Sequence, residues 1–85
     1  MPYDILLTRS VTHAQRMSAM LEKAGISAPY FRPPAALTKR GCGYAVRIAE
    51  HWRADALRLL RGAGLEPVRI YHADADGTFR ELTLF

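Results

Sequence analysis

The alternation of apolar and polar residues divides the chain into two β-α-β passes and a final strand. Short apolar runs predict buried strands at residues 3–8, 29–32, 44–48 and 67–72. Helical spacing of apolar residues after the first and third strands predicts two helices, which we expect to end at Gly25 and Gly64. Asp76-Gly77 is a hairpin signal, so residues 78–84 are expected to fold back as a fifth strand.

The residues of the two predicted helices can be assigned in more detail. The first helix is expected to begin at Ser10 or Thr12, because Thr12 and Gln15 fit a capping box. Its expected buried face comprises Val11, Ala14, Met17, Leu21 and Ala24. The second helix is expected over residues 53–62, with a buried face of Ala56, Leu57, Leu60 and Ala63.

This order of elements predicts the fold class. It favours an α+β ferredoxin-like βαββαβ sandwich, in which two helices cover one face of an antiparallel sheet. The segments LEKAGI (21–26) and LRGAGL (60–65) echo each other, each before a proline and an apolar strand. With 85 residues we expect a single domain, with a core over about residues 3–72 and a C-terminal hairpin strand within 73–85.

Composition places the chain among globular proteins. Its apolar content is 49%, and Asp4 interrupts the first apolar run too early for a signal peptide. No apolar run approaches the roughly 18 residues of a membrane span, so no membrane partner is expected. These features predict a soluble cytoplasmic protein, in which a free thiol stays reduced.

The net charge of +4 is concentrated in the middle of the chain. Between Glu22 and Glu50 there is no acidic residue, and the segment carries a charge of +5, against −1 for the remainder. Its basic residues are Lys23, Arg32, Lys39, Arg40 and Arg47. Such a segment attracts an anionic ligand or an acidic partner surface, or its side chains are simply solvated. The sequence leaves both interpretations open.

Cys42 is the only cysteine, and Gly41 and Gly43 flank it. Reactive cysteines favour accessible, electropositive turns, and Lys39 and Arg40 supply positive charge next to this one. The flanking glycines allow a sharp bend and the close approach of a partner. A reactive or carrier thiol is one interpretation, and a small residue at the start of a strand is the other.

Other chemistries find less support in the sequence. The three histidines have no metal-ligand spacing, so we expect no metal, and no motif indicates a cofactor. His13 pairs with Cys42 only if the first helix begins close to the Cys42 loop; otherwise it is solvated. Nucleic-acid binding is disfavoured because the central strands offer only Tyr3 and Tyr44 for base stacking.

The segment Cys42-Gly43-Tyr44-Ala45-Val46-Arg47 resembles the Cys-Gly-x-Ala-x-Arg motif of the selenium/sulfur carrier family of small bacterial proteins. The resemblance extends over about residues 3–72. Further matching positions are Ser10, Ala14, Pro34, Leu37 and Thr38. The chain departs from the family pattern in a longer loop, with Gly41 as the insertion, in Ser18 at a commonly acidic position, and in the hairpin after residue 72.

This resemblance implies a carrier rather than an enzyme with its own turnover. Cys42 would accept sulfur or selenium from a desulfurase-like donor protein, as a persulfide or selenylsulfide, and pass it to an acceptor protein. The residues expected to support it are Gly41, Gly43, Arg47, Lys39, Arg40, Thr38, Ser10, Arg9 and His13. The alternative is a small-molecule-sensing or regulatory ferredoxin-like module with Cys42 incidental. Either class could form a homodimer through the sheet edge.

Overall fold

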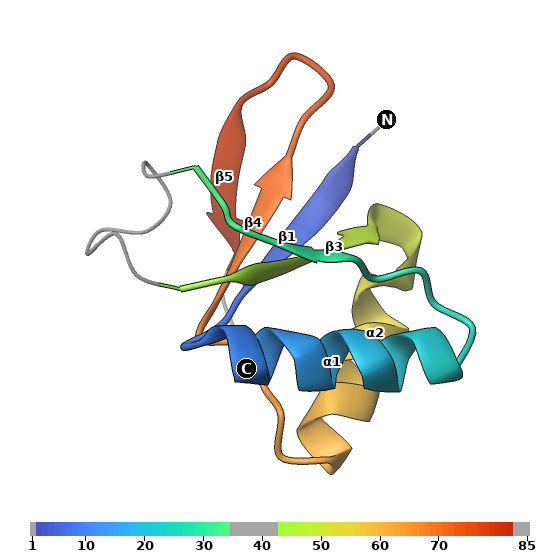
Figure 1. Ribbon diagram of the computed structural model, residues 1–85. Coiled ribbons are helices and arrows are strands. Elements are labelled where there is room, and N and C mark those ends of the chain that lie inside the picture. Colours follow the sequence, from blue (N-terminus) through green and yellow to red (C-terminus); the bar gives the residue numbers. More distant parts are fainter. Residues whose placement is uncertain (1, 35–42, 83–85) are drawn as a thin grey trace.

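The computed structural model describes residues 2–34 and 43–82, which form a sheet with two helices packed together on one of its faces (Figure 1). The elements in chain order are β1 (Tyr3–Leu7), α1 (Val11–Lys23), β2 (Tyr30–Phe31), β3 (Ala45–Ala49), the 3-10 turn η2 (Glu50–Trp52), α2 (Arg53–Gly62), β4 (Arg69–Ala73) and β5 (Phe79–Leu82). The predicted α+β class is confirmed, and the described residues form five strands and two helices in the predicted order.

The strands lie in the order β2-β3-β1-β4-β5, and each pairs with its neighbours in antiparallel fashion. β1 is the central strand. Its residue Tyr3 lies opposite Ala49 of β3 on one side and Ala73 of β4 on the other. The two strands that follow α1 and α2 most closely therefore lie on opposite sides of β1.

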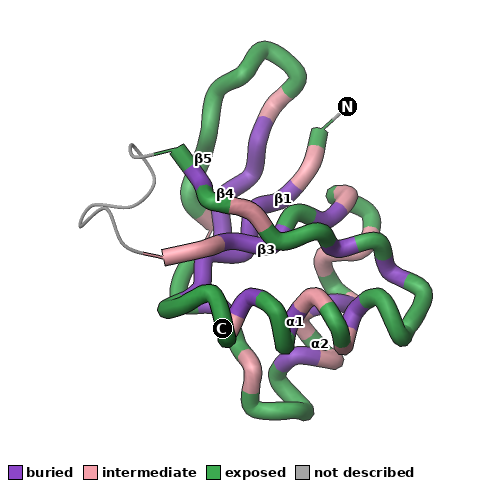
Figure 2. The backbone as a smooth tube through the Cα atoms, viewed as in Figure 1, coloured by how far each residue is buried: buried purple, intermediate pink, exposed green. Residues whose placement is uncertain are grey.

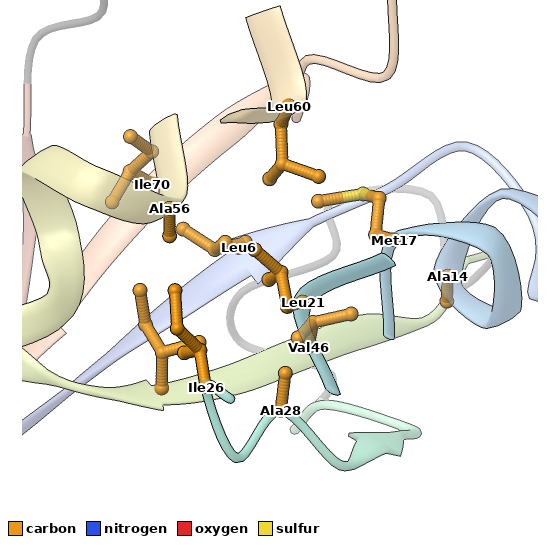
Figure 3. Close-up of a cluster of buried hydrophobic side chains, with 11 residues drawn as sticks. Leu6, Ala14, Met17, Leu21, Ile26, Ala28, Val46, Ala56, Leu60 and Ile70 are labelled. Atoms are coloured by element: carbon orange, nitrogen blue, oxygen red, sulfur yellow. The ribbon is translucent and has the colours of Figure 1, made fainter. Parts of the chain in front are cut away.

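Alternation along the strands separates two apolar clusters. Leu6 of β1 faces the helices and packs with buried residues of α1 and α2, among them Met17 and Leu60 (Figure 3). Figure 2 shows how burial concentrates in β1, β3 and β4 and on the inner sides of the helices. A second cluster on the other face joins Ile5, Leu7, Ala45 and Tyr71. Burying an aliphatic side chain of this size contributes about 1.5–3 kcal/mol, so the inner cluster supplies much of the stability.

The helix ends follow from local chemistry. Ser10 is the N-cap of α1, and its Oγ accepts a hydrogen bond from the backbone N–H of His13 at 3.1 Å. The capping box expected at Thr12 is therefore wrong. Gly25 and Gly64 adopt positive φ angles of 87° and 71°, as predicted, and turn the chain out of each helix.

Other sequence expectations differ in detail. Val11, Ala24 and Ala63 are exposed rather than buried, because they lie at helix ends where the chain no longer faces the sheet. β2 is only two residues long, since Pro29 has no N–H for the ladder. Within residues 2–34 and 43–82, neither helix is long and apolar enough to cross a membrane.

Candidate functional site

The start of β3 is fastened to the turn between β1 and α1. The backbone N–H of Thr8 donates to the carbonyl oxygen of Tyr44 at 2.8 Å, and the Thr8 hydroxyl lies 2.7 Å from the same oxygen. The hydroxyl is also 3.0 Å from the carbonyl oxygen of Ser10. Thr8 itself is buried, whereas Tyr44 is half-buried and Ser10 is exposed. These contacts fix the beginning of β3 beside the N-terminal end of α1.

Gly43 is positioned by this attachment. Its φ angle is +129°, and a Cβ atom at this position would lie 3.0 Å from the carbonyl oxygen of Thr8. Both the backbone conformation and the available space therefore require glycine. The described contact is with the chain's own β1–α1 turn. That glycine here also admits a partner stays a prediction.

Three of the predicted site residues lie together at this turn. Arg9, Ser10 and His13 line a cavity of about 530 Å³, with Thr12 and Arg16 of α1 and with Gly64, Leu65 and Glu66, which follow α2. The first turn of α1 has no acidic residue. The Ser10 hydroxyl already caps the helix, whereas the side chains of Arg9 and Arg16 are exposed. The cavity lining therefore carries two guanidinium groups against the single carboxylate of Glu66, so its net charge is positive.

Arg47 lies apart from these residues. Its guanidinium carbon is 5.5 Å from the centre of the Tyr3 ring, a cation–π contact on the face of the sheet away from the helices. Gly43 and Arg47 are four positions apart, which corresponds to roughly 13 Å of extended chain. The structure therefore does not bring Arg47 together with Ser10 and His13. The remaining predicted site residues, Cys42, Gly41, Lys39, Arg40 and Thr38, lie outside the described residues, and their roles stay predictions.

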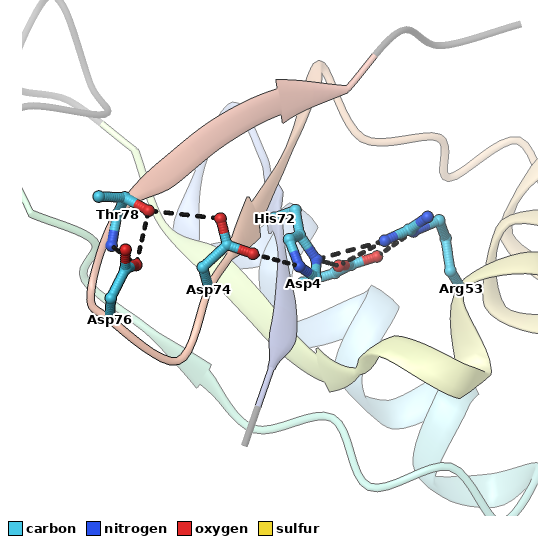
Figure 4. Close-up of polar contacts among 6 residues, drawn as sticks. All are labelled: Asp4, Arg53, His72, Asp74, Asp76 and Thr78. Carbon is cyan, nitrogen blue, oxygen red and sulfur yellow. Dashed lines mark hydrogen bonds and ion pairs between the residues drawn. The ribbon is translucent and has the colours of Figure 1, made fainter.

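A second polar cluster lies on the helix-facing side of the sheet (Figure 4). Asp4 of β1 is fully buried and accepts hydrogen bonds from Nε and Nη2 of Arg53, the latter at 3.1 Å. Nδ1 of His72 is 3.0 Å from Asp4 Oδ1, and Nε2 of His72 is 3.1 Å from Asp74 Oδ1. We call these four residues the Asp4 cluster.

The charged and polar groups of the Asp4 cluster are paired with one another, as in a cluster that stabilises the fold. The hydrogen bond to Asp4 raises the pKa of Arg53; burial opposes this effect, and the charges of Asp4 and Glu50 add to it. Both ring nitrogens of His72 face carboxylates, so neither is available to a substrate. Among the described residues, no group of three His, Cys, Asp or Glu side chains is arranged to hold a metal ion.

The Asp4 cluster was not among the predicted sites. The sequence pattern marked Asp4 only as an interruption of an apolar run. A signal was present in the strand pattern, because Asp4 and His72 occupy positions of β1 and β4 that alternate onto the buried face. Polar residues at such positions are normally hydrogen-bonded to each other or to a third group.

The geometry defines a small α+β protein in which the only cysteine is joined by a peptide bond to a glycine fixed beside a basic turn. Comparison with protein-family models matches residues 3–72 to the family described as "Putative Se/S carrier protein-like". The chain belongs to this selenium/sulfur carrier family, as the resemblance predicted. Neither the curated proteins nor the solved structures contain a match.

Membership of a carrier family implies a donor and an acceptor in general terms. The matched residues end at His72, so β5 (Phe79–Leu82) lies beyond the match. The hairpin that forms β5 is thus an addition to the part of the chain that carries the family likeness.

Proposed function

We propose that this protein carries sulfur or selenium on the thiol of Cys42. The observation that carries the proposal is that a member of a selenium/sulfur carrier family contains a single cysteine. The thiolate is the nucleophile in persulfide and disulfide chemistry, and the chain offers no other thiol. The absence of a second cysteine also favours relay over disulfide formation within the chain.

The loading step balances without an external oxidant or reductant. The Cys42 thiolate attacks the outer sulfur of a donor persulfide, R–S–SH, and a new S–S bond forms at Cys42. The donor's own S–S bond breaks, and its electron pair leaves on the donor thiolate R–S⁻. The products are Cys42–S–SH and R–S⁻, and delivery to an acceptor thiolate repeats the exchange with Cys42 as the leaving group. A selenium atom in the outer position follows the same course.

The surroundings of Gly43 suit this chemistry. Both the attacking thiolate and the ionised persulfide are anions, which neighbouring cations stabilise. Arg9 and His13 lie at the turn to which Gly43 is fastened, and Lys39 and Arg40 precede Cys42 in the sequence. Arg47 is further along β3 and contacts Tyr3, so we assign it a lesser part in stabilising the anion.

We extend the proposal to the fold and the compartment. The order β2-β3-β1-β4 is the one that two interleaved β-α-β units produce, so we assign a ferredoxin-like single domain with β5 appended to β4. A carrier thiol has to stay reduced between transfers, which a reducing compartment such as the cytoplasm provides.

The test is loading of Cys42→Ser and of the unaltered protein by a cysteine desulfurase supplied with sulfur-labelled cysteine. Mass spectrometry is expected to find one added sulfur atom on the peptide containing Cys42 and none in Cys42→Ser. Circular dichroism of both proteins controls for folding. Label retained by Cys42→Ser, or no label on either protein, would refute the proposal.

The pH dependence of alkylation supplies a second readout that needs no donor protein. A carrier thiol in a basic setting is expected to react with iodoacetamide with an apparent pKa below the unperturbed value of about 8.5. A slow reaction with an unshifted or raised pKa would make Cys42 a packing residue. That result would favour the alternative class of a small-molecule-sensing module.

A further inference from the structure

Charge is divided unequally between two parts of the chain. Residues 5–49 contain seven basic and one acidic side chain, a net charge of +6, whereas the other residues contain five basic and seven acidic, a net charge of −2. The first part supplies α1, β2 and β3, and the second supplies α2, β4 and β5. Because the strand order is β2-β3-β1-β4-β5, the basic part forms one edge of the sheet and the acidic part forms the other (Figure 1).

Ion pairs within the acidic part neutralise some of its carboxylates. Several of its carboxylates pair with arginines of the same part, among them Asp55 with Arg58 at 2.9 Å and Glu81 with Arg69 at 2.9 Å. Glu66 lines the cavity beside α1, but its carboxylate lies 3.6 Å from Arg61. These carboxylates already have cationic partners of their own.

The basic part keeps cations that are not paired in this way. Across residues 2–34 and 43–82, no carboxylate lies within 4.0 Å of the guanidinium of Arg9 or Arg16. Both side chains line the cavity of about 530 Å³, together with His13 and the hydroxyl-bearing Ser10 and Thr12. We call this the basic cavity.

The basic cavity has the size and chemistry to receive carboxylate side chains. A guanidinium group binds a carboxylate through two parallel N–H···O bonds, and hydroxyl groups supply further donors. A volume of this order holds a small ligand or a few side chains of a peptide. None of its lining residues is Phe, Tyr or Trp, which single-stranded nucleic acids need for base stacking. Carboxylates of a protein therefore fit the cavity better than a single-stranded nucleic acid does.

We propose that the basic cavity docks an acidic segment of the protein that exchanges sulfur with Cys42. This inference rests on the proposed function. The location of the basic cavity supports the inference. The turn at Arg9–His13 is held through Thr8 to Tyr44 and lies against Gly43. Gly43 in turn is joined by a peptide bond to Cys42. An acidic segment held on Arg9 and Arg16 would bring a donor sulfur to the same end of β3.

The test uses two synthetic peptide donors of equal length, each with one central cysteine persulfide. Glutamates flank the cysteine in one peptide, and glutamines flank it in the other. The unaltered protein is expected to take sulfur from the glutamate peptide about fivefold to tenfold faster. Arg9→Gln with Arg16→Gln is expected to remove this preference, and raised salt is expected to diminish it. Arg80→Gln, on β5 at the opposite edge, is the matched control and is expected to keep the preference.

A binding measurement separates failure of docking from failure of the carrier function. The glutamate peptide with serine in place of cysteine is titrated into the protein while backbone amide signals are followed by NMR. Shifts at Arg9, His13 and Arg16 that vanish in the double variant support docking, even if no sulfur reaches Cys42. Sulfur transfer at equal rates from both peptides, or an absence of those shifts, would overturn the inference.

Two other occupants of the basic cavity would also overturn it. Stronger shifts of the same amides with a single-stranded RNA oligonucleotide would assign the surface to nucleic acid. A salt-sensitive dimer in size-exclusion chromatography, lost in the double variant, would assign it to the acidic edge of a second copy of the chain.

Discussion

Replacement of Asp4 by alanine tests whether the Asp4 cluster holds the sheet to α2. The Asp4 side chain is fully buried and contacts Arg53 of α2 and His72 of β4. Asp4→Ala removes the carboxylate and leaves His72 Nδ1 without that partner. The change therefore removes one member of a buried ion pair and leaves the other in place. This is more destabilising than replacing both members by apolar residues.

The structure sets the expected magnitude. Removing one member of a fully buried pair lowers the free energy of unfolding by about 3–5 kcal/mol. The Arg53 side chain is 35% exposed and can turn toward water, which reduces the penalty, so we expect a loss of about 2–4 kcal/mol. A chain of 85 residues has a total stability of about 4–13 kcal/mol, so the loss is a large fraction of the whole.

Urea unfolding followed by the fluorescence of Trp52 measures this loss, because Trp52 is the only tryptophan and is half-buried beside Arg53. With a slope near 1 kcal/mol/M, the midpoint is expected to fall by about 2–4 M. Asp55→Ala is the matched control: it removes an exposed aspartate–arginine pair and is expected to change stability by less than about 0.5 kcal/mol. Equal midpoints for the two variants would refute a stabilising role for the Asp4 cluster.

Two further predictions concern turns. Gly43→Ala is expected to lower the free energy of unfolding by about 1–3 kcal/mol, because alanine disfavours a φ of +129° and its Cβ would meet the Thr8 carbonyl. Gly62→Ala, in open space on α2, is expected to be neutral or stabilising, and a similar loss in both variants would contradict this explanation. Hydrogen bonds from the Thr78 hydroxyl and N–H lower the pKa of Asp76, so its contribution to stability is present above the ordinary value of 3.8 and is lost as the pH falls through the lowered value. NMR titration is expected to place the midpoint below 3.8, and Thr78→Ala is expected to raise it; an unchanged midpoint would contradict the assignment.

Local patterns were sufficient to predict most of the elements. The helix over residues 53–62 is observed with its predicted bounds. The spacing of its apolar residues marks the buried face of the helix, and the positive φ of Gly64 turns the chain out of it. The observed strands begin or end one or two residues away from their predicted bounds. At β2, the prolines on either side shorten the ladder more than the apolar pattern indicates.

The polar clusters and the candidate site depend on contacts between residues far apart in the sequence, which a local sequence pattern does not reveal. Asp4 and His72 are 68 positions apart and meet only because β1 pairs with β4. Arg47 follows Cys42 by five residues, yet strand alternation turns it toward Tyr3 on the face away from α1. Conversely, Arg9, Ser10 and His13 were predicted as site residues, and they line one cavity. The sequence indicated which residues were unusual, and the strand pairing determined which of them meet.

The central place of β1 has a consequence for how the protein is made. Tyr3 pairs with Ala73, 70 positions later, and the sheet between them is complete only when β4 has been added. Until then one edge of β1 has no strand to pair with, and Asp4 lacks its histidine partner. Contacts this distant in sequence slow folding. We therefore expect nascent chains that end before β4 to remain unfolded and to need protection from aggregation on the ribosome.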